Sequence, residues 1–92
     1  MDNEEFDDVL EYPDFIEVAL SKKFSNINGI GLEMFELLEP YIGKIKMSYH
    51  HKELKLRLEK EGDWIRDLAS ILDVIHTLYK RRKPKKNEET SE

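Results

Sequence analysis

The clearest pattern of hydrophobic and polar positions lies between residues 63 and 80. Apolar residues recur there at alternating steps of four and three, the spacing of one helix face: Trp64, Leu68, Ile71, Ile75 and Leu78. Ile65, Leu72 and Tyr79 widen this face on one flank and Val74 on the other, so the apolar arc covers roughly 200° of the helix. With Asp63 as a suitable N-cap, the pattern predicts a long amphipathic helix over about residues 63–82.

Between residues 42 and 60 the period of the pattern changes from 3.6 to 2. Apolar and polar residues alternate on both sides of His51-Lys52, and a turn there brings all six apolar residues onto one face by pairing Tyr49 with Leu54, Met47 with Leu56, and Ile45 with Leu58. The pattern predicts a β-hairpin over about residues 42–60. Because the segment is rich in good helix formers and lacks an Asn-Gly or Asp-Gly turn, a third helix, and with it an all-α four-helix fold, remains the alternative.

Two helices are expected before this hairpin. Pro13 suits the first turn of a helix over residues 14–24, in which Ile16, Ala19, Leu20 and Phe24 share one face. A loop rich in Asn and Gly follows, and a second helix over residues 32–38 ends near Pro40. The expected fold class is therefore α+β, with the hairpin lying on the C-terminal helix and the two N-terminal helices covering the other side.

The ends of the chain differ from its middle in composition. We expect an acidic, flexible leader over residues 1–12, a single globular domain over residues 13–83, and a charged, disordered tail over residues 84–92. The leader carries three hydrophobic residues with the spacing of a short partner-binding motif: Phe6, Val9 and Leu10.

The net charge of −5 conceals a basic central part. Residues 15–86 hold fifteen Lys and Arg against ten Asp and Glu. A basic hairpin that follows two helices is similar to the layout of winged-helix nucleic-acid-binding proteins, although the second helix carries Glu33, Glu36 and Glu39 and no base. The residues that would contact nucleic acid are Lys44, Lys46, Lys55, Arg57, Arg81 and Arg82.

No catalytic, cofactor-binding or metal-binding motif is found. The chain has no cysteine, and the neighbouring His50 and His51 point to opposite faces of a strand, so they cannot bind one metal together. No apolar run approaches the 18 residues of a membrane span. We therefore expect a cytoplasmic protein that is not an enzyme, needs no cofactor and does not enter a membrane.

The wide apolar arc of the last helix indicates protein–protein contact. A small domain has little surface with which to cover it, so we expect a homodimer through Trp64, Ile65, Leu68, Leu72, Ile75 and Tyr79. Together these observations favour a small regulatory or adaptor protein that binds itself and another protein, with nucleic-acid binding as the alternative.

Overall fold

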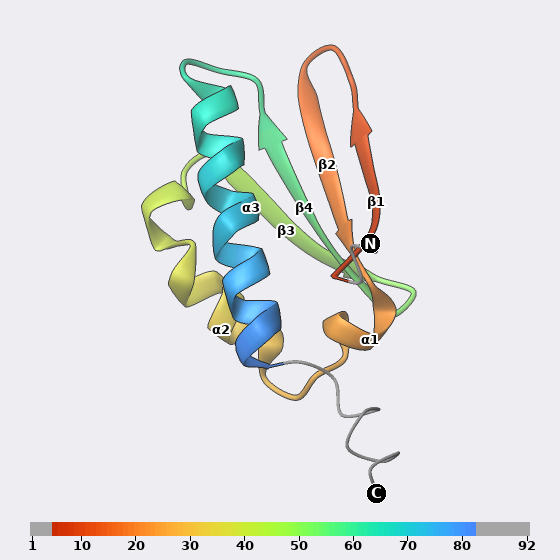
Figure 1. Cartoon of the computed structure of the whole chain (residues 1–92). Helices are drawn as coiled ribbons and strands as arrows, with labels where there is room; N and C mark the ends of the chain where they lie inside the picture. Colours follow the sequence, from red (N-terminus) through yellow and green to blue (C-terminus); the bar gives the residue numbers. More distant parts are fainter. Residues whose placement is uncertain (1–4, 83–92) are drawn as a thin grey trace, which may run out of the picture.

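The computed structural model describes residues 5–82, which form a four-stranded antiparallel sheet with helices packed on it (Figure 1). The elements are β1 (Phe6–Glu11), β2 (Phe15–Leu20), α1 (Lys22–Ser25), α2 (Ile30–Leu37), the 3-10 helix η1 (Glu39–Tyr41), β3 (Ile45–His50), β4 (Glu53–Glu59) and α3 (Trp64–Arg81). The mixed α+β class is confirmed. The tail predicted over residues 84–92 lies outside the described residues.

The predicted hairpin is confirmed as β3 and β4, and its register is the one derived from the sequence: Tyr49 lies opposite Leu54, Met47 opposite Leu56, and Ile45 opposite Leu58. His51 and Lys52 form the turn with φ angles of 52° and 66°. Two adjacent residues with positive φ are what a two-residue hairpin turn of the right twist requires. The turn therefore forms although neither residue is glycine or asparagine.

The helix predicted over residues 14–24 is wrong. Residues 15–20 form β2, and only the four-residue α1 follows it. Ile16, Val18 and Leu20 alternate along β2 and are all buried, since Ile16 and Val18 lie opposite Leu58 and Leu56 of β4. Pairing with a strand about forty residues away thus overrides the helical spacing of the same residues.

The prediction of a flexible leader also needs correction. Its described part forms β1, which pairs with β2 and is an edge strand of the sheet, whose strand order is β1-β2-β4-β3. Pro13 and Asp14 do not begin a helix; they form the turn between these strands, closed by a hydrogen bond of 2.8 Å from the N–H of Tyr12 to the carbonyl of Phe15. Proline suits the second position of such a turn.

The core lies between one face of the sheet and the helices. Phe24, Met34, Leu38, Ile71 and Ile75 are among its buried residues and pack against the inward side chains of β2, β3 and β4. The C-terminal helix is confirmed as α3, and α2 lies beside it on the same face (Figure 1). The expectation that two helices cover the opposite face of the hairpin is wrong, and no helix within residues 5–82 lies on that outer face of the sheet.

Candidate interaction surface

The edge strand β1 exposes apolar side chains together with unpaired backbone. Val9 and Leu10 keep 46% and 41% of their surface exposed, and no strand within residues 5–82 pairs with the outer edge of β1. Hydrogen-bonded and non-hydrogen-bonded pairs alternate along an antiparallel ladder. Because Tyr12 and Phe15 form a hydrogen-bonded pair, the alternation shows which residues of β1 bond to β2 and which do not. The backbone groups of Asp8 and Leu10 bond to β2, and those of Val9 and Glu11 point away from the sheet.

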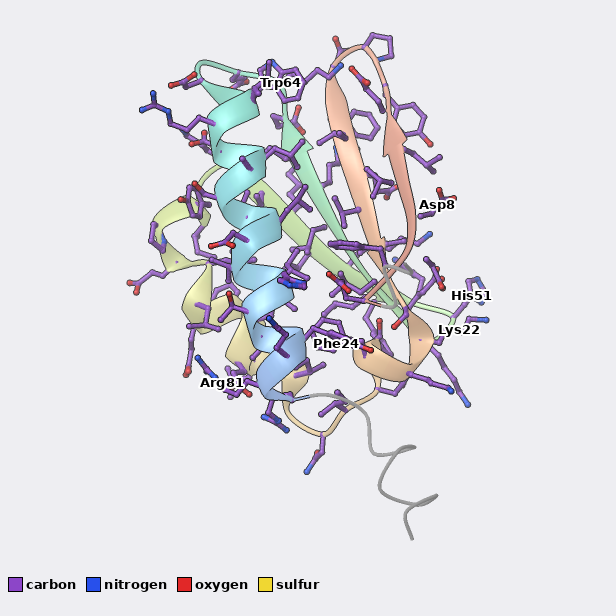
Figure 2. All side chains as sticks on the ribbon, viewed as in Figure 1. Asp8, Lys22, Phe24, His51, Trp64 and Arg81 are labelled. Carbon is purple, nitrogen blue, oxygen red and sulfur yellow. The ribbon has the colours of Figure 1, made fainter. Side chains whose placement is uncertain are left out.

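Side-chain contacts hold this strand in place at both ends. At one end Lys60 donates to Glu11 at 2.7 Å and lies over the ring of Trp64, 4.9 Å from its centre. At the other end the buried carboxylate of Glu5 contacts Nδ1 of His76 on α3 at 2.8 Å. The edge of β1 is therefore held against the body of the domain, and it presents Asp8 outward (Figure 2).

The predicted partner-binding residues do not all face solvent. Phe6 is half-buried and packs against the core, whereas Val9 and Leu10 are exposed. The predicted partner-binding residues did not include Asp8 and Glu11, which belong to the same edge. Their charge is visible in the sequence, but their place on an edge strand follows only from the pairing of β1 with β2 and the strand order.

The predicted dimer residues of α3 are divided between the core and the surface. Ile75 and Tyr79 are 0% and 7% exposed, so their assignment to an interface is wrong because the sheet of the same chain covers them. Ile65 is 66% exposed. The remaining residues are partly buried against the core: Trp64, Leu68 and Leu72. Since His76 contacts Glu5, the exposed flank of α3 that carries Ile65 and His76 is the one turned toward β1.

Three of the six basic residues predicted to contact nucleic acid form ion pairs with carboxylates of the same chain. Lys44 donates to Asp67 at 2.8 Å, and this hydrogen bond raises the pKa of Lys44 above its ordinary value. Arg81 lies 3.6 Å from Glu33, and Arg82 forms an ion pair with the same carboxylate. These contacts join α3 to the loop before β3 and to α2.

The other three lie on the outer face of the sheet. Arg57 stands over the ring of Phe15, 3.7 Å from its centre, and forms an ion pair of 3.2 Å with Glu59. Lys46 lies opposite Arg57, and Lys55 lies opposite Ala19. Among the described residues, β2 occupies the place that the first helix of a winged-helix layout would take.

A pair of carboxyl groups lies near the tip of the β3–β4 hairpin. A hydrogen bond with Asp7 raises the pKa of Glu53, and partial burial acts in the same direction, while Lys55 and Lys22 oppose the shift. Figure 2 shows Lys22 and His51 at this end of the molecule. A carboxyl group with a raised pKa suits acid–base chemistry only in a pocket from which water is excluded, and Glu53 lies in no such pocket among the described residues.

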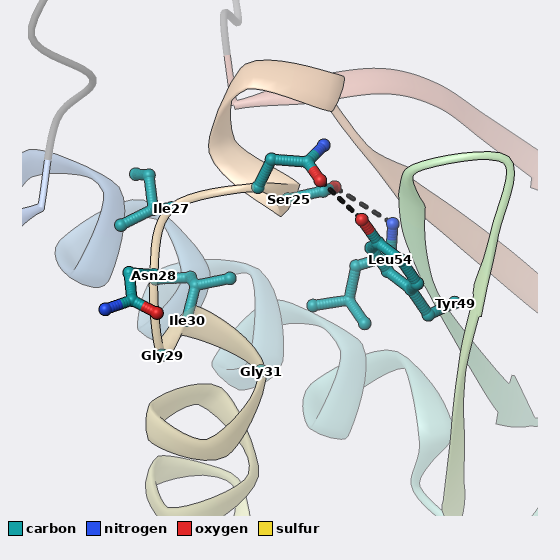
Figure 3. A pocket seen from close by; sticks show the side chains of 9 residues that line it. Ser25, Ile27, Asn28, Gly29, Ile30, Gly31, Tyr49 and Leu54 are labelled. Atoms are coloured by element: carbon teal, nitrogen blue, oxygen red, sulfur yellow. Dashed lines mark hydrogen bonds between the residues drawn. The ribbon is translucent and has the colours of Figure 1, made fainter.

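The concavity beside this tip has a volume of about 360 Å³ (Figure 3). It lies between the loop that joins α1 to α2 and the hairpin. Three of its polar side chains already have partners, since the hydroxyl of Tyr49 donates to the side-chain oxygen of Asn26 and Ser25 accepts from the N–H of Leu54. None of the buried side-chain nitrogen or oxygen atoms within residues 5–82 lacks a hydrogen-bond partner. The concavity offers a binding partner no unsatisfied buried polar group.

Among the described residues no group of three or more His, Asp or Glu side chains is arranged to hold a metal ion. No helix in this part of the chain is long and apolar enough to cross a membrane. Comparison with models of known protein families finds no match for the chain, and comparisons with curated proteins and with solved structures find none either.

Proposed function

We propose that the protein is a small non-enzymatic adaptor or regulatory domain that binds another protein through the edge of β1. The observation that carries this proposal is the exposure of Val9 and Leu10 on a strand whose outward backbone groups are unpaired. An exposed edge with apolar side chains invites the addition of a further strand, and many proteins recognise extended segments in this way. Asp8 on the same strand favours a partner segment that carries positive charge, whereas the charge of Glu11 is already paired with Lys60.

The proposal is tested by placing a photo-crosslinking amino acid at position 10 of the full chain in the cells that produce it. We expect a discrete adduct with a protein partner. A matched probe at Thr77, on the exposed side of α3, is expected to give none. Either the absence of an adduct at position 10 or the same adducts at position 77 would contradict the proposal.

A second variant separates strand addition from simple proximity. The N–H of Val9 points away from β2, so Val9→Pro removes a donor from the outer edge while leaving the ladder with β2 complete. We expect this substitution to abolish the adduct at position 10 and to leave the circular dichroism spectrum unchanged.

Nucleic-acid binding is a second proposal, supported by the position of Lys46, Lys55 and Arg57 on a sheet face that no described helix covers. Acidic residues on the same face, Glu17 opposite Arg57 among them, weaken it. Fluorescence anisotropy with labelled single-stranded DNA and RNA tests it directly, since binding through these residues would fall steeply with salt and would be lost in Lys55→Glu. Unchanged anisotropy at low salt would eliminate this function.

A further inference from the structure

The two edges of the sheet carry opposite charge. The β1 edge presents Asp8, and Glu11 beside it is paired with Lys60, whereas the β3 edge presents Lys46. Lys46 is exposed, and His50 follows on the same face of β3. Within residues 5–82 no strand pairs with the outside of either edge. One chain therefore holds two unpaired strands of complementary charge on opposite sides of the same sheet.

As in β1, alternate residues of β3 point their backbone N–H and C=O groups away from the sheet. The N–H of Glu59 donates to the carbonyl of Lys44 at 3.4 Å, and this places Lys46 and Ser48 at the hydrogen-bonded positions of the ladder with β4. The backbone groups of Ile45, Met47 and Tyr49 consequently point outward. Their side chains belong to the helix-covered face, as does that of Val9, which lies opposite the buried Val18.

The direction of the strands permits the two edges to meet. All neighbouring strands are antiparallel and there are four of them, so β1 and β3 run in opposite directions. A second copy shifted sideways in the same orientation places its β3 beside β1 as an antiparallel neighbour, with the helices of both copies on one face. The pairing requires no rotation of one copy relative to the other beyond the twist of the sheet.

We propose that the partner of the β1 edge is the β3 edge of a second copy of this chain, so that the sheet continues from one copy to the next. This inference rests on the proposed function and names its partner. The part of β1 after its irregularity at residues 6–8 can pair with β3 so that Val9 lies opposite Met47 of the second copy. Both residues point their backbone groups outward, so this register lets them bond to each other. Asp8 is then a diagonal neighbour of Lys46 of the second copy, within reach of a long side chain.

Charge makes this pairing more favourable than its symmetric alternatives. Two β1 edges would bring Asp8 and Glu11 of one copy against the same acids of the other, and two β3 edges would bring Lys46 against Lys46. Like charges facing each other across strands are destabilising. The favoured contact is heterologous, so it leaves a free β1 and a free β3 at the ends, and assembly continues beyond two copies.

The test uses the purified full chain in sedimentation velocity and light scattering. The wild-type protein is expected to show an average mass that rises with protein concentration and falls as salt is added. Lys46→Glu places an acidic side chain at the contact position of both edges, and Asp8→Lys places a basic side chain at both. Each variant alone is therefore expected to remain monomeric. An equimolar mixture of the two restores opposite charges at every contact and is expected to assemble.

Matched controls carry the same charge changes on the exposed side of α3: Lys80→Glu and Asp73→Lys. Both are expected to assemble as the wild type does. The inference is overturned if the wild type stays monomeric at all concentrations, if either edge variant assembles alone as well as the wild type, or if the mixture fails to assemble. A monomeric wild type whose position-10 probe still captures a different protein would refute self-pairing and leave the proposed function standing; a monomer without adducts would refute both.

Discussion

The hydroxyl of Ser25 accepts a hydrogen bond of 2.9 Å from the backbone N–H of Leu54 in the interior of the domain. Leu54 of β4 lies opposite Tyr49 of β3 in a pair without hydrogen bonds. The N–H of Leu54 therefore points away from β3 and toward the other neighbour of β4, which is β2. The pairing of β2 with β4 reaches only Ala19 and Lys55, because the chain then turns into α1. Ser25 replaces the missing strand partner, and its own hydroxyl proton is donated to the carbonyl of Leu20 at 3.3 Å.

Replacing this serine by alanine should therefore destabilise the fold. Ser25→Ala leaves the N–H of Leu54 buried without an acceptor, and we expect the free energy of unfolding to fall by about 1–3 kcal/mol. Urea denaturation measures this change. Ser48→Ala removes the same hydroxyl from an exposed position of β3 and should change stability by less than about 0.5 kcal/mol. Equal effects of the two substitutions would contradict the role given to Ser25.

The turn of the β3–β4 hairpin stores backbone strain that a glycine would relieve. Lys52 has a φ of 66°, and its carbonyl accepts a hydrogen bond of 2.8 Å from the side-chain amide of Asn26. Lys52→Gly keeps this carbonyl and removes the side chain that disfavours positive φ, so we expect a gain in stability of about 1 kcal/mol. Lys52→Ala keeps the strain and serves as the control. A gain as large for alanine as for glycine, measured by thermal unfolding, would mean that the charge of Lys52 matters and its backbone does not.

How much of this fold the sequence predicts depends on how local the deciding contacts are. The β3–β4 hairpin is predictable because its strands are joined by two residues and their apolar positions coincide in one register. In β2, by contrast, Ile16 and Leu20 fit both a helix and a strand. The choice is made by Leu58, far along the chain, which lies opposite Ile16.

The same reason limits prediction of the candidate surface. The sequence identifies Val9 and Leu10 as apolar residues in an acidic segment, but only the strand order shows that their backbone forms an edge. It also cannot show that Lys44 and Arg82 are engaged by Asp67 and Glu33, since these pairs join elements whose packing is decided by the whole core.

The carboxyl pair near the hairpin tip makes stability depend on pH. The pKa of Glu53 is raised because it shares a hydrogen bond with Asp7, so the folded protein holds this proton more tightly than the unfolded chain does. The contribution of Glu53 to the free energy of unfolding therefore rises as the pH falls through the raised pKa, and it is complete below the unfolded value of about 4.3.

Asp7→Asn removes one of the two charges that oppose each other at neutral pH. We expect the variant to be more stable than the wild type at pH 7 and this advantage to shrink toward pH 4, where Glu53 of the wild type is protonated. Urea unfolding at both pH values measures the difference. Asp8→Asn removes a neighbouring charge that forms no hydrogen bond with Glu53, and its effect should be the same at both pH values. If Asp7→Asn behaved as that control does, the hydrogen bond of Glu53 with Asp7 would not be the cause of the raised pKa of Glu53.

Two of the three isoleucines of α3, Ile65 and Ile75, distinguish a helix buried in its own domain from a helix that forms a dimer seam. Ile75 is 0% exposed and Ile65 is 66% exposed, although both belong to the apolar arc of the same helix. Ile75→Ala opens a cavity among the side chains of the core, so we expect a loss of about 2–5 kcal/mol that does not depend on protein concentration. Ile65→Ala should cost less than about 0.5 kcal/mol, because solvent already surrounds the side chain. Thermal unfolding over a hundredfold range of concentration measures both effects. A large loss for Ile65→Ala that appears only at high concentration would show that α3 is covered by a second copy, and the assignment of self-contact to the sheet edges would then be wrong.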